Sequence, residues 1–111
     1  MGNRSYEIVK FTKDLVLKGM YIGEGQTASL KVRKGEMAKI YLVSDGSSVD
    51  ITAIRPLDEQ KVFEIYSDLN EGVDTNVLEL KNLWVGNYVF TDNKNTFNVE
   101  KLPYITQNYL V

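Results

Sequence analysis

Apolar and polar residues alternate strictly in several short runs of this 111-residue chain. Over residues 27–33, Ala28, Leu30 and Val32 fall on one side, and the polar residues between them fall on the other. Three further runs repeat the pattern: 38–42, 49–53 and 96–100. A period of two is typical of β-strands, whose successive side chains point to opposite faces, and it conflicts with the helical period of 3.6. The pattern therefore predicts strands that each present one face to a core.

The remaining segments favour the same kind of structure. Residues 5–11 are apolar on both faces, which predicts an edge strand lying between two sheets or covered by a partner. Residues 61–66 are expected to form a strand, in preference to a helix over 57–66, because Val, Phe, Ile and Tyr favour strands. Gly19–Gly25 is expected to be a connection. Pro56 is expected to end a strand, because it has no N–H for the ladder.

Turn-forming residues separate these runs at intervals of roughly eight to twelve residues. The length of the chain fits one domain. In the absence of a convincing helical pattern, the spacing predicts an all-β protein, a single antiparallel β-sandwich of about seven to nine short strands.

Composition excludes several chemistries. The chain contains no cysteine and no histidine, so thiolate and imidazole catalysts are excluded, as are nearly all zinc and copper sites. The net charge is −2, and the thirteen Lys and Arg residues are scattered along the chain. This distribution argues against nucleic acid and against a membrane surface as partners. We expect no enzyme activity, no cofactor and no small-molecule ligand.

The sequence also bears on where the protein is made. No apolar leader follows the N-terminus, and no apolar run is long enough to span a bilayer. These features predict synthesis in the cytoplasm without a signal peptide.

Residues 78–92 contain two alternating runs on either side of a corner. At this corner Leu83, Gly86 and Tyr88 resemble the tyrosine corner of bacterial and phage immunoglobulin-like domains. The resemblance implies that the ring of Tyr88 packs in the core while its hydroxyl bonds to backbone across the corner. It predicts an immunoglobulin-like sandwich, although the paired cysteines of antibody-type domains are absent.

One acidic loop is a weak candidate for a calcium site. Asp68, Asn70 and Asp74 lie around Gly72, together with Glu71. Their oxygen atoms are the ligands that calcium prefers, but the spacing does not match an EF-hand loop. A solvated acidic loop is therefore the favoured interpretation.

Two aromatic residues are candidates for a sugar-binding platform. Trp84 lies in the corner, and Tyr41 lies on the outer face of a predicted strand. The favoured interpretation is packing: Trp84 covers one end of the core, and Tyr41 contacts its cross-strand neighbours.

Residues 103–111 form a tail after the predicted sandwich of residues 1–102. A terminal segment frays unless something holds it. Apolar residues in the tail therefore predict packing on the domain itself or on a neighbouring subunit. With Trp84, they are the candidate interaction residues: Tyr104, Ile105, Tyr109, Leu110 and Val111.

These observations predict a non-enzymatic module that docks onto other protein subunits of a larger assembly. The most concrete form, which the resemblance implies, is a phage virion component such as an auxiliary (decoration) protein of the capsid. It would be made in the host cytoplasm; a protein that is not phage-encoded is expected to stay in the cytoplasm. The alternative is a carbohydrate-binding or adhesin-type sandwich, since this architecture hosts many unrelated functions.

Overall fold

The computed structural model describes residues 3–44, 46, 49–69, 83–91, 95–102 and 107–110. This part of the chain is mostly strand, in two antiparallel sheets, with one short helix. The predicted antiparallel β-sandwich of short strands is confirmed, with one helix in addition to the strands. The elements in chain order are β1 (Asn3–Phe11), β2 (Leu15–Gly23), β3 (Gln26–Val32), β4 (Met37–Ser44), β5 (Val49–Leu57), α1 (Glu59–Leu69), β6 (Val85–Thr91), β7 (Thr96–Lys101) and β8 (Gln107–Leu110).

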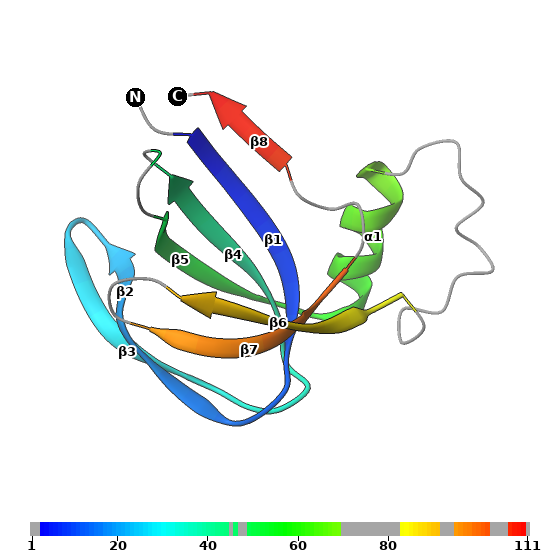
Figure 1. Ribbon diagram of the computed structural model, residues 1–111, viewed down its shortest axis with the longest axis horizontal. Helices are drawn as coiled ribbons and strands as arrows, with labels where there is room; N and C mark the ends of the chain where they lie inside the picture. Colours follow the sequence, from blue (N-terminus) through cyan, green and yellow to red (C-terminus); the bar gives the residue numbers. More distant parts are fainter. Residues whose placement is uncertain are drawn as a thin grey trace.

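The larger sheet has six strands in the order β5-β4-β1-β7-β6, with β8 pairing alongside β1, and β2 and β3 form a separate hairpin (Figure 1). The first strand pairs with β4 along Asn3–Lys10, with β7 at Val9–Phe11 and with β8 at Asn3–Tyr6. The prediction that this segment is an edge strand is therefore wrong. Its apolar residues on both faces reflect a central position, where both faces of the sheet are covered.

The two faces of β1 enter two different apolar clusters. Val9 and Phe11 belong to the larger cluster, which buries residues of the β2–β3 hairpin against the sheet. Tyr6 and Ile8 belong to the second cluster, which buries residues of α1. The hairpin and the helix consequently cover opposite faces of the large sheet, as Figure 1 shows. The inward rows predicted from alternation are found in the larger cluster: Ala38, Ile40, Leu42, Phe97 and Val99 are buried, and Leu30 packs against them.

The strand predicted over residues 61–66 is wrong, because α1 occupies Glu59–Leu69. Asp58 begins the helix: its Oδ1 accepts a hydrogen bond from the Lys61 N–H at 2.7 Å, and its carbonyl accepts one from the Val62 N–H at 3.1 Å. Val62 and Tyr66 share one face of the helix and are buried in the second cluster. Capping and burial on one side outweigh the strand preference of the individual residues.

Two further boundaries differ from the prediction. β2 continues to Gly23, so that Gly19 lies within the strand, at a shift in register between Leu17 and Met20. A positive φ of 74° at Gly19 accommodates this irregularity. Pro56 does not end its strand: it lies within β5, which pairs only with β4 among the described strands. An edge position tolerates proline because the missing N–H faces away from the ladder.

β5 also departs from strict alternation. A register shift next to Tyr41 and Leu42 changes which side chains face the hairpin. Ile51 is buried as expected, but Ile54 rather than Ala53 packs against the larger cluster.

Candidate functional site

The prediction that Tyr88 packs in the core is wrong. Its side chain lies on β6, opposite Val99 of β7, and is 42% exposed. The Nζ atom of Lys101 lies 4.9 Å from the centre of its ring. β6 has only one neighbouring strand among the described residues, so its side chains are covered from one side only. The immunoglobulin-like assignment stays a prediction. Its main support was a buried tyrosine at the corner, and Tyr88 is not buried.

The other two residues of the corner lie close to the start of β6. Gly86 has a φ of 20° and coincides with a register shift between Val85 and Asn87. Leu83 is half-buried and packs against the second cluster. The first arm of the predicted corner, residues 78–82, lies outside the described residues.

β6 forms an exposed edge of the large sheet. Every residue of β6 except Phe90 is exposed, and the exposed apolar side chains are Val85 at 38%, Tyr88 at 42% and Val89 at 65%. The strand carries no charged residue and no proline. On one side of β6, the backbone therefore has no partner strand among the described residues, and its apolar side chains are in contact with water.

The opposite edge of the same sheet is built differently. β5 carries Asp50, Arg55 and Pro56, all of them exposed. Charges and proline on an edge strand oppose pairing with another chain. By this comparison β6 lacks the protection that β5 has.

A second feature lies on the helix side of the large sheet, where two tyrosines and two cations meet. Tyr6 and Tyr41 are directly opposite on β1 and β4, and their ring centres are 6.5 Å apart. The Nζ atom of Lys39 lies 4.0 Å from the ring centre of Tyr6 and 5.1 Å from that of Tyr41. The guanidinium carbon of Arg55 lies 5.8 Å from the ring centre of Tyr41. We call these four residues the cation–tyrosine cluster.

Two other cations of the large sheet, unlike those of this cluster, have carboxylate partners. Lys10 has a carboxylate oxygen of Glu100 at 3.0 Å, and Lys101 has one of Glu7 at 3.3 Å. Among the described residues, no carboxylate oxygen lies within 4.0 Å of Lys39 or Arg55. Lys39 and Tyr41 are two residues apart on β4 and therefore share a face, but the register between strands, which the sequence does not show, brings Tyr6 and Arg55 to them.

The rings considered for a sugar platform are both in contact with cations. Trp84 is half-buried, packs against the second cluster and has Lys10 Nζ 5.0 Å from its ring. Tyr41 is half-buried between its strand neighbours and the two cations described above. Both rings thus take part in packing within the domain, and the sugar platform stays a prediction.

The predicted calcium loop falls mostly outside the described residues. Asp68 is exposed near the end of α1, whereas Asn70, Glu71 and Asp74 are not described. In the part of the chain that is described, no three His, Cys, Asp or Glu side chains gather as metal ligands would.

The tail contributes one described strand. β8 pairs antiparallel with β1, with Tyr109 opposite Arg4 and Leu110 opposite Asn3. Tyr104, Ile105 and Val111 lie outside the described residues. Backbone pairing on its own domain thus holds residues 107–110.

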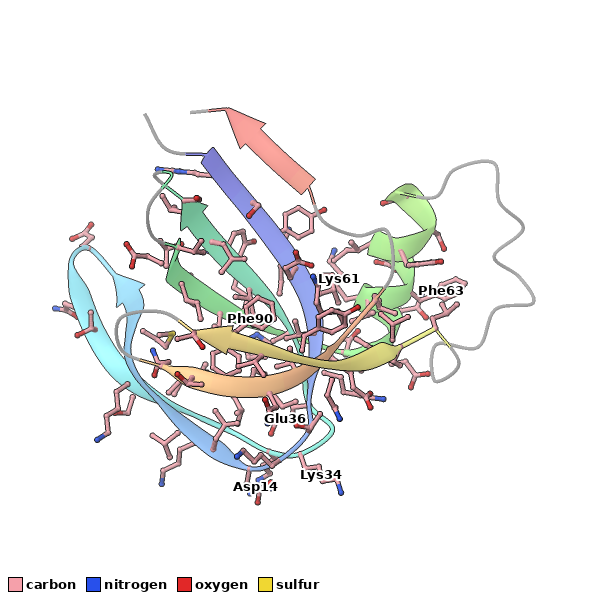
Figure 2. All side chains as sticks on the ribbon, in the orientation of Figure 1. Asp14, Lys34, Glu36, Lys61, Phe63 and Phe90 are labelled. Carbon is pink, nitrogen blue, oxygen red and sulfur yellow. The ribbon has the colours of Figure 1, made fainter. Side chains whose placement is uncertain are left out.

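A shallow hollow of about 330 Å³ lies at the base of the β2–β3 hairpin, with Asp14 and Lys31 in its lining. Figure 2 shows Asp14 beside Lys34, whose backbone N–H donates to Asp14 Oδ1 at 2.8 Å. Nearby, Glu36 Oε1 accepts a hydrogen bond from the Arg33 N–H at 3.2 Å. The two carboxylates stabilise the turn between β3 and β4, so we assign no ligand to this hollow.

Comparisons with protein-family models, with curated proteins and with solved structures find no match. Among the described residues, no helix has the length and apolar composition needed to cross a membrane.

Proposed function

We propose that the protein is a non-enzymatic interaction module that assembles with a second copy of itself by pairing along β6, as a unit of a larger protein assembly. The observation that carries this proposal is the exposed, uncharged edge of β6. The lack of cysteine and histidine in the whole chain supports the non-enzymatic part, because a thiolate nucleophile and an imidazole base are missing.

An open strand edge presents unpaired N–H and C=O groups that another strand can satisfy. Two copies of β6 in antiparallel pairing would form a two-fold interface, in which each copy offers the same surface. No like charges would then be opposed, because β6 has none. The exposed side chains of Tyr88 and Val89 would lose contact with water at the same time.

The size of the interface sets the expected affinity. Full burial of a valine side chain contributes about 1.5–3 kcal/mol, and association costs about 4–15 kcal/mol. Each copy contributes three partly exposed apolar side chains and one short strand edge, and their incomplete burial exceeds this cost only narrowly. We expect a weak dimer, with Kd roughly 0.1 mM, which gains strength when many copies are arranged together.

The test is the mass of the protein in solution as its concentration rises. Sedimentation of the wild-type chain should show dimers at high concentration, and the β6 amides should gain protection from hydrogen exchange. Val89→Lys places a charge on the edge and should leave a monomer. The control is Val49→Lys, because Val49 is 44% exposed on the other edge strand, β5.

Two results would oppose the proposal. One is a wild-type chain that stays monomeric up to about 1 mM, well above the expected Kd. The other is a dimer that Val49→Lys abolishes and Val89→Lys leaves intact.

The virion role predicted from the sequence is a narrower form of this proposal. It rests on the resemblance to immunoglobulin-like domains and on the exclusion of other chemistries. Neighbouring genes for capsid and portal proteins, with the chain present in purified particles, would support it. Absence of the chain from such particles would oppose it.

A further inference from the structure

Lys39 of β4 and Arg55 of β5 are direct cross-strand partners on the large sheet. Like charges in directly opposite positions of an antiparallel pair destabilise the sheet. Both cations also lie near the ring of Tyr41, and Lys39 lies over the ring of Tyr6 as well. The negative faces of the rings attract cations but carry no net charge, so the two positive charges stay without a counter-ion at this position among the described residues.

The fold supplies no counter-charge at this position among the described residues. The ion pairs of Lys10 and Lys101 are on other strands, β1 and β7, and their carboxylates come from Glu100 and Glu7. Within the described part of the chain, the interactions of the Lys39 and Arg55 head groups are with aromatic rings. The cluster therefore holds two adjacent positive charges that an external anion could neutralise.

We propose that Lys39 and Arg55 bind a phosphate monoester group. A phosphate monoester carries a charge of about −1.5 to −2 near pH 7, whereas a carboxylate carries only one negative charge. The planar guanidinium of Arg55 can bind two of the phosphate oxygens, and the ammonium of Lys39 can bind a third as a point charge. The phosphate would thereby remove the repulsion between the two strands.

The tyrosines prepare the site before the ligand arrives. Tyr6 is buried, and its ring lies 4.0 Å from Lys39 Nζ, so the lysine head is held over the sheet. The ring of Tyr41 lies near both cations, which are on the same face of the large sheet. Fixing the cations in advance lowers the entropy lost on binding. This site lies on β4 and β5 and does not depend on pairing along β6.

One phosphate group is the favoured ligand, rather than a nucleic acid strand. A strand of nucleic acid needs a row of cations that follows its backbone. The cation–tyrosine cluster offers two cations, and the chain as a whole has a net charge of −2. A phosphate monoester can still come from a phosphorylated protein side chain, a mononucleotide or inorganic phosphate.

The test is an NMR titration of the full chain at constant ionic strength, with inorganic phosphate, a phosphoserine peptide and a mononucleotide in separate arms. We expect saturable shifts centred on Lys39, Tyr41 and Arg55, with Kd about 1 mM for inorganic phosphate. Lys39→Gln and Arg55→Gln should each weaken binding at least tenfold. Lys31→Gln, on the exposed face of β3, is the control and should bind like the wild type.

The arms separate the sources of the phosphate group. Tighter binding of the peptide or of the nucleotide than of inorganic phosphate identifies the natural carrier, and equal binding identifies free phosphate. Acetate binding as tightly as phosphate would overturn the assignment. Shifts that do not saturate, or equal weakening in Lys31→Gln, would do the same. Chemical shifts elsewhere in each variant report whether it is folded.

Discussion

The Oε2 atom of Glu7 lies 3.3 Å from the Nζ atom of Lys101, joining β1 to β7 across the large sheet. Glu7 is only 7% exposed, and the side chain of Lys101 is 24% exposed. Lys101 also contacts the ring of Tyr88 on β6. A mostly buried charge needs its partner, because losing one member leaves the other in a poorly solvated position.

Replacing Lys101 by methionine should therefore destabilise the fold. We expect Lys101→Met to lower the free energy of unfolding by about 1–3 kcal/mol, since the Glu7 charge stays buried. Denaturant unfolding measures this change. The control is Lys61→Met, whose partner Glu64 is 4.0 Å away and where both side chains are more than half exposed. That change should cost less than about 0.5 kcal/mol, and equal losses in the two variants would contradict the prediction.

The helix start at Asp58 provides a second prediction. Asp58→Ala removes the side-chain acceptor of the Lys61 N–H and should cost about 0.5–2 kcal/mol. Asp58→Ser keeps an acceptor and should restore most of the loss. Thermal unfolding of the two variants gives the difference. The prediction fails if alanine and serine are equally destabilising, because the effect then does not come from capping.

The two covered faces of β1 give a third prediction. Ile8→Ala opens a cavity on the helix side and should cost about 2–5 kcal/mol, and Phe11→Ala on the hairpin side should cost about 3–5 kcal/mol. Both side chains are almost completely buried. Val89→Ala, on the exposed edge, should change stability by less than about 0.5 kcal/mol. A small effect for either buried residue would mean that its face is not covered as the structure describes.

Alternation predicted the β-rich class because it marks which side chains a sheet buries. The row Ala38, Ile40 and Leu42 shows this directly, since all three are buried against the hairpin. Alternation could not tell an edge strand from a central one, because both can be apolar on two faces. Residues 5–11 were misplaced for that reason.

Other features depend on information that periodicity does not contain. The helix was missed although Asp58 at its start, and Val62 and Tyr66 one turn apart, were available as signals. Tyr88 was expected in the core because the corner pattern contains no information on which strand lies at the edge of the sheet. The pairing of Lys39 with Arg55 could not be predicted, because it depends on the register between β4 and β5.

This pairing gives the last prediction, which concerns stability without ligand. Arg55→Gln removes one of two opposed cations and should raise the free energy of unfolding by about 0.2–1 kcal/mol at low salt. The gain should shrink as salt screens the repulsion. Lys39→Gln also removes the repulsion, but it loses the contact with the Tyr6 ring, worth about 0.5–2 kcal/mol, so it should gain less or be destabilised. Arg55→Gln also loses its contact with the Tyr41 ring, but at 5.8 Å this contact is weaker than that of Lys39 with Tyr6 at 4.0 Å. Thermal unfolding in phosphate-free buffer at two salt concentrations measures both variants. If rising salt does not favour the wild type over Arg55→Gln, the two cations do not oppose each other.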